Sequence, residues 1–268
     1  MLIPMPEMLR ERAAFAVDPA PARDAATIAV VRDGEAGLEA FLMRRQATMA
    51  FAAGMYVFPG GGVHAEDAAE LPWTGPGPDY FASRFACAPE TARSLVVAAA
   101  RETFEETGVL LAGPDEHSVV ADAGEFHEAR ERLERHEYSF AQFLHRNGLV
   151  LRADLLGAWA HWITPKFEPR RYDTRFFVTV LPEGQRIDSV STEADRSLWA
   201  PLSEVLARVD LGRAAMLPPT SVTCRELALE SASSVLEAAE TRLIRPIEPQ
   251  LVEVDGELWL EIEQEDHV

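Results

Sequence analysis

Cysteine and lysine are scarce in this sequence. It holds only 2 cysteines, Cys87 and Cys224, and neither stands in a CxxC pair or at metal-ligand spacing from a histidine. A disulfide framework and a cysteine-based metal site are therefore excluded, and we interpret both thiols as small buried apolar side chains. Lys166 is the only lysine among 25 basic residues, so arginine carries nearly all of the positive charge.

Long apolar runs are also absent. No stretch approaches the roughly 20 residues that span a bilayer, and residues 1–12 show neither a cationic leader nor a long apolar segment. We therefore expect a globular, cytoplasmic protein with no membrane partner. The formal net charge of −19 argues against nucleic acid as a partner, because phosphate backbones are bound by clustered cations. Part of this acidity lies in residues 257–266, where we predict a solvated surface.

Short apolar runs bounded by turn residues predict strands in the first quarter of the chain. Residues 26–31 and 38–44 flank the pair Asp33-Gly34 and predict a β-hairpin. Residues 55–58 predict another strand, which Pro59 and three glycines end. Prolines and glycines then recur up to Pro89 and disfavour a continuous strand or a long helix, so we interpret residues 63–89 as an insertion or loop.

Helix-forming residues dominate the next segment. Residues 90–107 contain neither proline nor glycine and precede Gly108, a pattern that predicts a helix with a left-handed residue after its end. Residues 123–146 predict a second helix, whose apolar stripe favours a packing role. The pattern further predicts strands at 157–163 and 175–181, helices at 202–209 and 221–239, and a terminal hairpin at 251–254 and 257–262.

Three carboxylates in the first predicted helix carry the strongest chemical signal. Residues three and four apart share a helix face, so Glu102, Glu105 and Glu106 project together and repel one another. Hard divalent cations such as Mg²⁺ or Mn²⁺ prefer carboxylate oxygens and would relieve that repulsion. Arg101 can orient one carboxylate through a bidentate contact. The alternative interpretation is an ordinary solvated acidic face.

The run from Arg101 to Val109 resembles the second half of the Nudix box, and Pro59-Gly60-Gly61 resembles its entry. Every fixed position matches except Thr103, which stands where the family has an apolar residue. The family places the arginine fourteen residues after the glycine, whereas Gly61 and Arg101 are 40 apart, which leaves 40 − 14 = 26 extra residues. The proline-rich insertion accounts for them. The family's early glutamate, eight before the arginine, falls on Arg93, so we assign that role to no residue.

The resemblance implies an α/β fold, an α/β/α sandwich in which this helix packs on a mixed sheet. It further implies that Glu105 and Glu106 bind Mg²⁺ or Mn²⁺, that the Gly60 carbonyl completes the coordination sphere, and that Glu102 is a ligand or the general base. Arg101 would hold Glu102 in place. Bound cations would neutralise a diphosphate, lower the pKa of water and orient it for attack on phosphorus.

A second region resembles one branch of this family. Residues 162–165 and 170–177 are similar to a segment of insertion-bearing Nudix enzymes that act on coenzyme A. Lys166, Arg170 and Arg171 form the densest basic cluster of the chain, which favours an anionic ligand. Pairing of these arginines with surface carboxylates is the alternative. Arg44, at the end of a predicted strand before the glycines, is a further candidate for substrate binding.

A late acidic residue completes the predicted site. Glu193 lies six residues before Trp199 and resembles the acidic residue that many Nudix enzymes place opposite the helix, as a further ligand or general base. Asp195, two residues on, is the alternative. Residues 217–220 resemble a turn found in the same branch and are otherwise interpreted as a connector.

Together these patterns predict an N-terminal arm (1–24), a Nudix hydrolase domain (25–245) with extra C-terminal helices, and a C-terminal hairpin with an acidic tail (246–268). The expected function is metal-dependent cleavage of a phosphoanhydride in a small nucleotide-type substrate, with coenzyme A or acyl-coenzyme A favoured. The alternatives are a pyrophosphatase for ADP-ribose, NADH or dinucleoside polyphosphates, and a Nudix-fold module that binds a nucleotide without cleaving it. The N-terminal arm and the terminal hairpin are candidates for pairing between subunits of a homodimer.

Overall fold

A mixed sheet of eight strands forms the centre of the molecule. The computed structural model describes residues 2–4, 19–46, 54–188 and 194–262. The path through the sheet is β11-β3-β2-β10-β9-β12, with β4 added beside β3 and β5 beside β2. The bounds are β2 (Arg23–Gly34), β3 (Gly37–Arg45), β4 (Tyr56–Val57), β5 (Gly60–Gly62), β9 (Gly157–Ile163), β10 (Tyr172–Val180), β11 (Ala194–Pro201) and β12 (Pro246–Ile247).

The strand directions confirm the predicted hairpin and the mixed sheet. β2 and β3 pair antiparallel, from Val31 opposite Ala40 to Gly34 opposite Gly37. β10 runs parallel to β2 and antiparallel to β9, so parallel and antiparallel ladders meet at the same strand. β5 adds to the other part of β2, where Gly60 pairs with Thr27, which brings the glycine run to the middle of the sheet.

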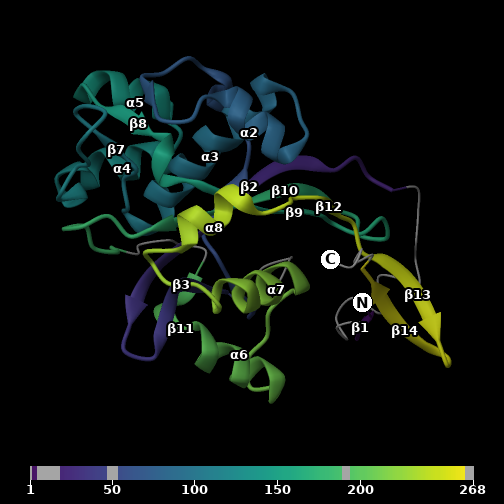
Figure 1. Ribbon diagram of the computed structural model, residues 1–268. Helices are drawn as coiled ribbons and strands as arrows, with labels where there is room; N and C mark the ends of the chain where they lie inside the picture. Colours follow the sequence, from purple (N-terminus) through teal and green to yellow (C-terminus); the bar gives the residue numbers. More distant parts are fainter. Residues whose placement is uncertain (1, 5–18, 47–53, 189–193, 263–268) are drawn as a thin grey trace.

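Helices cover both faces of this sheet, as the α/β/α prediction requires. Side chains of β2 alternate between the layers: Ile28 and Val30 join one apolar core, and Ala29 and Val31 join the other. Figure 1 shows α2 to α5 on one side of the sheet and α6 and α7 on the other. The helices are α2 (Pro78–Phe85), α3 (Pro89–Thr107), α4 (His127–Glu134), α5 (Phe140–Asn147), α6 (Leu202–Asp210), α7 (Pro218–Leu227) and α8 (Val235–Thr241).

Two stretches that were each predicted as one helix are interrupted by turns in the structure. The stretch 123–146 becomes the short 3-10 helix η2 (Ala123–Phe126), then α4 and α5, with a turn at 135–139. His136 takes a positive φ of 54° in that turn, and the Ser139 hydroxyl accepts a hydrogen bond from Gln142 N to cap α5. The stretch 221–239 divides into α7 and α8 at a serine-rich turn, where the main-chain N–H of Ser231 donates to the Ser234 hydroxyl.

The N-terminal and C-terminal strands form a small separate sheet. β1 (Leu2–Pro4) pairs with β14 (Glu257–Glu261), which pairs with β13 (Gln250–Val254) across the predicted turn Asp255-Gly256. The predicted C-terminal hairpin is therefore confirmed. Strand β1 of the N-terminal arm pairs with this hairpin within the same chain. A third sheet contains β6 (Trp73–Thr74), β7 (Ala112–Gly113) and β8 (Val150–Arg152), followed by η3 (Ala153–Leu155). In the described part of the chain, no helix combines the length and apolarity that crossing a membrane requires.

The proline-rich insertion belongs to the core, which corrects its interpretation as a loop. It contains the 3-10 helix η1 (Ala65–Ala68), β6 and α2. Phe81 and Phe85 of α2 are 0% and 2% exposed, and their rings lie 6.1 and 5.2 Å from that of Phe177 in the central sheet. The composition of this segment predicted a loop because turn-forming residues dominate it. Two aromatic side chains on one face of the two-turn helix α2 are nevertheless enough to bury that helix against the sheet.

We predict that the insertion contributes directly to stability. Replacing Phe85 with alanine should lower the free energy of unfolding by about 3–5 kcal/mol, as expected for a fully buried ring, measured by urea denaturation. The control is Leu229→Ala, since Leu229 is 86% exposed and surface changes usually stay within about 0.5 kcal/mol. Similar small changes in both variants would show that α2 is dispensable to the core.

Candidate functional site

The three predicted carboxylates lie on α3, in the last two turns of a buried helix. Pro89 occupies the first turn, where its missing N–H costs nothing, and Gly108 ends the helix with a φ of 76°. Glu102 and Glu105 are 9% and 7% exposed, so both are largely removed from water. Thr103, the departure from the family pattern, is fully buried, and its hydroxyl donates to the Ala99 carbonyl at 2.8 Å. The hydroxyl is thereby satisfied at a position that the family fills with an apolar side chain.

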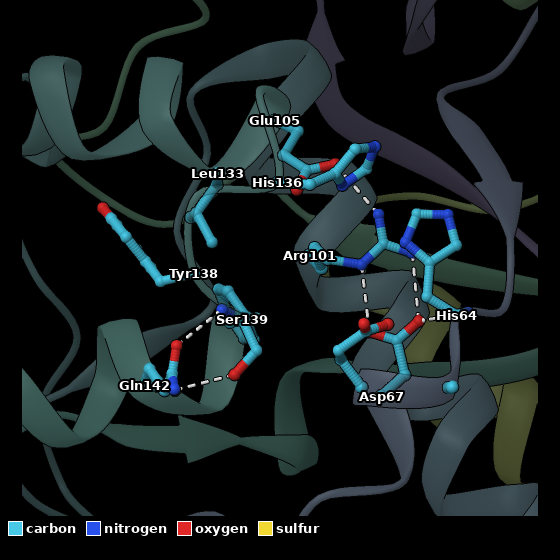
Figure 2. Close-up of a pocket in the computed structure, with 12 residues that line it drawn as sticks. His64, Asp67, Arg101, Glu105, Leu133, His136, Tyr138, Ser139 and Gln142 are labelled. Carbon is cyan, nitrogen blue, oxygen red and sulfur yellow. Dashed lines mark hydrogen bonds and ion pairs between the residues drawn. The ribbon is translucent and has the colours of Figure 1, made fainter.

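Arg101 holds the carboxylates together. One terminal nitrogen donates to Glu102 Oε1 at 2.8 Å and to Glu105 Oε2 at 2.9 Å. The other terminal nitrogen donates to the Gly62 carbonyl and to Asp67 Oδ2, both at 3.0 Å, and Nε donates to Asp67 Oδ1 at 3.0 Å. All five guanidinium N–H donors are therefore used. Figure 2 shows Arg101 between Asp67 and Glu105 at the back of a cavity.

Asp67 is the site residue that the sequence analysis missed. It lies in η1, is 2% exposed, and binds Arg101 in a bidentate geometry while accepting a further bond from His64 N. The sequence does contain a pattern that points to Asp67. The family's early carboxylate is eight residues before the arginine and therefore six after the glycine, and Asp67 is six residues after Gly61. Counting forward from the glycine finds it, and places the 26 extra residues between Asp67 and Arg101.

The glycine run packs directly on the carboxylates. Gly60 N–H donates to Glu106 Oε2 at 2.7 Å. A Cβ on Gly61 would lie 2.3 Å from Glu102 Oε1, so a side chain there would displace the carboxylate. Gly60 has a φ of 153°, and a Cβ on it would lie 2.4 Å from the Ala26 carbonyl. The position of Gly60 therefore requires glycine, because the main chain of β5 approaches β2 too closely for a side chain, whereas a side chain at Gly61 would move the Glu102 carboxylate.

Burial destabilises the charge of Glu105. Burial raises the pKa of its carboxyl to about 7, because desolvation outweighs the opposing charge of Arg101 and the charge of Glu102 adds to the effect. Its Oε1 atom is buried and has no hydrogen-bond partner among the described residues. A carboxylate in this condition has a strong electrostatic reason to bind a cation.

Arg130 supports the same helix end from α4. It is 3% exposed, and its Nε donates to the main-chain carbonyl of Glu105 at 2.9 Å. A terminal nitrogen donates to the Asp188 carbonyl, and Asp188 N donates to the Thr107 carbonyl. Arg130 thus provides a hydrogen-bond donor to a main-chain carbonyl at the end of α3, and it links this helix end to Asp188.

A cleft of about 800 Å³ opens above the carboxylates. Its lining includes Glu102, Glu105, Glu106 and Gly60 from the predicted metal set, and Trp162 and Tyr172 from the strands beside it. The turn 217–220, noted in the sequence, also lies in its wall. Glu168, buried and unnoticed in the sequence, is a further acid that lines the cleft.

The predicted substrate cations divide into two groups. Arg170 lines the cleft, and Arg45 lines it beside the predicted Arg44. Arg171 is 10% exposed and instead donates to the main-chain carbonyls of Thr164 and Ala20 and to the Glu248 carboxylate. Lys166 is 61% exposed and lies 3.9 Å from Glu248. Of the cluster 166–171, the structure brings only Arg170 to the carboxylates, because the other two cations face the linker before β13.

The predicted late acid cannot be placed. Glu193 lies outside the described residues, and the side chain of Asp195 is likewise not described. Both therefore remain predictions.

The donor set fits a hard cation that substrate and water would help to hold. In the part of the chain that the structure describes, no three acidic, histidine or cysteine side chains are already arranged to hold a metal ion by themselves. Mg²⁺ usually binds through one or two carboxylates together with phosphate oxygens and waters, and it does not need a protein cage. The buried oxygen of Glu105 and the adjacent Glu106 and Glu102 supply such oxygens.

Comparison with known proteins identifies the family. Residues 81–225, more than half of the chain, match the family model described as the NUDT19 Nudix domain. The chain therefore belongs to the Nudix family, and within it to the group that this domain defines.

Individual relatives agree with this result. The chain is 26% identical over 204 residues to the acyl-coenzyme A diphosphatase NUDT19 of Xenopus laevis, which is 63% of this chain and 54% of that protein. It is 26% identical over 225 residues to the putative nudix hydrolase 7 of Caenorhabditis elegans, covering 81% of this chain and 64% of the relative. A crystal structure of a NUDIX hydrolase from Alicyclobacillus acidocaldarius superposes with a TM-score of 0.65 and 27% identity, covering 84% of this chain and 98% of that one. The chain thus spans little more than half the length of the curated relatives.

We predict that Glu105 makes stability depend on pH. Its folded-state pKa of about 7 lies above the ordinary 4.5, so its contribution is fully present below pH 4.5 and is lost as the pH rises through 7. In metal-free buffer, Glu105→Gln should therefore gain stability over the wild type between pH 5 and pH 8, on the order of 2 kcal/mol, measured by urea unfolding. Glu90→Gln, on the exposed first turn of the same helix, is the control. Parallel pH profiles for wild type and Glu105→Gln would contradict the assignment.

Proposed function

We propose that this protein is a metal-dependent pyrophosphohydrolase that cleaves the diphosphate of coenzyme A or an acyl-coenzyme A. The observation that carries the proposal is the set of buried carboxylates around Arg101 at the base of a cleft of about 800 Å³. Placing like charges out of water is costly, and a protein that only bound a nucleotide would gain nothing from it. Membership of the Nudix family and the likeness to an acyl-coenzyme A diphosphatase support the reaction class.

The charged side chains of α3 have different roles in the proposed reaction. Glu105 and Glu106 offer carboxylate oxygens to the cation, and the buried Oε1 of Glu105 is the first of these. When bound, Mg²⁺ or Mn²⁺ would neutralise the diphosphate and lower the pKa of the attacking water. Glu102, beside Gly61, is a further ligand or accepts the proton from that water, and Glu193 is the alternative acceptor. Arg101 fixes the orientation of Glu102 and Glu105, because its remaining donors are fixed by Asp67 and Gly62.

Cationic side chains in the cleft favour a substrate with several phosphates. Coenzyme A carries a 3′-phosphate in addition to its diphosphate, and Arg170 lines the cleft with Arg45 and Arg135. Guanidinium groups suit phosphate oxygens because they donate two parallel hydrogen bonds. Trp162 and Tyr172 add aromatic surface against which a base can stack. We therefore assign substrate binding to Arg170, whereas Lys166 and Arg171, predicted with it, are directed at Glu248.

We predict that Glu106→Gln abolishes hydrolysis and keeps the fold. Glutamine can still accept the hydrogen bond from Gly60 N–H, so the packing of β5 on α3 should persist. Activity on coenzyme A with Mg²⁺ or Mn²⁺ should fall by more than about 100-fold, since even outer-shell partners of metal ligands are worth 10–100-fold. Glu90→Gln serves again as the control on the same helix. Wild-type rates in a folded Glu106→Gln protein would remove the metal-site assignment.

We predict that Arg170 recognises the extra phosphate of coenzyme A. The wild type should prefer coenzyme A over 3′-dephospho-coenzyme A, and Arg170→Ala should erase that preference, at a cost of roughly 1.5–3 kcal/mol in kcat/KM for a lost charged hydrogen bond. Lys166→Ala is the matched comparison, because this cation lies four residues away and is mostly exposed. Equal rates of the wild type on both substrates, or an unchanged preference in Arg170→Ala, would remove the coenzyme A assignment and leave the reaction class standing.

A further inference from the structure

A second cavity, of about 580 Å³, lies on the other side of the carboxylate cluster. It is formed between η1 on one wall and the α4–α5 turn with the start of α5 on the other (Figure 2). Four residues line both this cavity and the cleft: His64, Arg101, Glu105 and His136. The rings of His64 and His136 are in edge contact at 5.1 Å and form the rim between the two spaces. Of the three carboxylates on α3, Glu105 therefore borders both spaces, whereas Glu102 and Glu106 line the cleft.

The two spaces differ in charge. Arg45, Arg135 and Arg170 line the cleft, whereas Arg101 is the one arginine or lysine among the described residues that line the second cavity. All five N–H donors of Arg101 are already directed at Asp67, Glu102, Glu105 and Gly62. Glu66 adds a negative charge to the wall. A phosphate group in this cavity would meet the acidic side chains of Glu66 and Asp67 with no arginine or lysine besides Arg101 among the described lining residues.

The walls instead suit an uncharged chain that is partly polar. Leu133 and Phe140 are buried apolar side chains on one wall, and the ring of Tyr138 lies beside them. Gln142 and Ser139 add amide and hydroxyl groups, which can exchange hydrogen bonds with amides of a ligand. Figure 2 shows Tyr138, Ser139 and Gln142 across the cavity from Asp67.

We infer that this cavity binds the uncharged, amide-containing arm that leaves the diphosphate on the side opposite the nucleotide. The inference rests on the proposed function, because it takes the diphosphate to lie at Glu102, Glu105 and Glu106. A diphosphate at that position has one substituent on each side. The cleft, lined by Arg45, Arg135 and Arg170 in addition to Arg101, takes the phosphorylated nucleoside, and the cavity between η1 and α5 takes the pantetheine arm. The α4–α5 turn and η1 therefore determine which non-nucleotide group of the substrate is accepted, and the nucleotide cleft does not.

Filling the cavity tests this assignment. Ala65 and Ala68 are exposed alanines of the same helical turn, and of the two only Ala65 lines the cavity. Ala65→Trp should raise the KM for coenzyme A at least tenfold, with Ala68→Trp within twofold of the wild type. Gln142→Trp, which narrows the cavity from the opposite wall, should reproduce the effect of Ala65→Trp.

The two halves of the substrate give the selective measurement. Cleavage leaves one phosphate of the diphosphate on each half, and the nucleoside half keeps its 3′-phosphate as well, so 4′-phosphopantetheine and adenosine 3′,5′-bisphosphate are used as separate inhibitors. Ala65→Trp should weaken inhibition by 4′-phosphopantetheine at least tenfold and leave inhibition by the bisphosphate unchanged. Loss of both, or of neither, in folded Ala65→Trp and Gln142→Trp proteins would overturn the inference while the proposed function stands. Absence of coenzyme A hydrolysis by the wild type would overturn both.

Discussion

The interaction on which the rest of the site depends is the buried guanidinium of Arg101. Several carboxylates approach one another in a volume that excludes most water, and each would be strongly destabilised without a compensating charge. A guanidinium supplies this compensating charge, and its five N–H donors lie in a rigid plane and point in fixed directions. Asp67, Glu102, Glu105 and the Gly62 carbonyl occupy those directions. One side chain therefore fixes η1, β5 and α3 relative to one another.

This arrangement leaves the cluster short of positive charge. Arg101 supplies one positive charge to Asp67, Glu102 and Glu105, and Glu106 accepts a hydrogen bond from the main-chain N–H of Gly60. The consequence is visible at Glu105, where burial raises the pKa to about 7 and one oxygen is left without a hydrogen bond among the described residues. The fold thus tolerates a local electrostatic cost at the position where a cation and a diphosphate would remove it, a common feature of functional sites.

The insertion explains how such a site is held in place. Its first element, η1, supplies Asp67 to Arg101, and its last element, α2, buries Phe81 and Phe85 against the central sheet. The α4–α5 region adds Arg130, which binds the main-chain carbonyl of Glu105. η1, which carries Asp67, and the α4–α5 region, which carries Arg130, therefore orient both ends of the carboxylate cluster, and these two segments also line the second cavity.

Local features of this protein were determined by the sequence alone. The helix bounds around 90–107, the β2–β3 and terminal hairpins, and the common face of Glu102, Glu105 and Glu106 follow from helical spacing and from turn residues, which act over a few positions. The reaction class followed from the same short run. The breaks at 135–139 and 228–234 were missed, because a periodic apolar pattern does not show where the chain must reverse to cover a sheet.

Tertiary structure decided which residues meet. Asp67 reaches Arg101 across 34 residues, and Arg170 faces the cleft while Arg171, its neighbour in sequence, faces Glu248. Neither result can be read from composition or spacing, since the direction of a side chain depends on the strand and loop that carry it and on distant partners that neutralise it. The charge difference between the two spaces beside the carboxylates has the same origin. It arises because elements far apart in the chain bring Arg45, Arg135 and Arg170 to the cleft, and acidic and uncharged side chains to the second cavity.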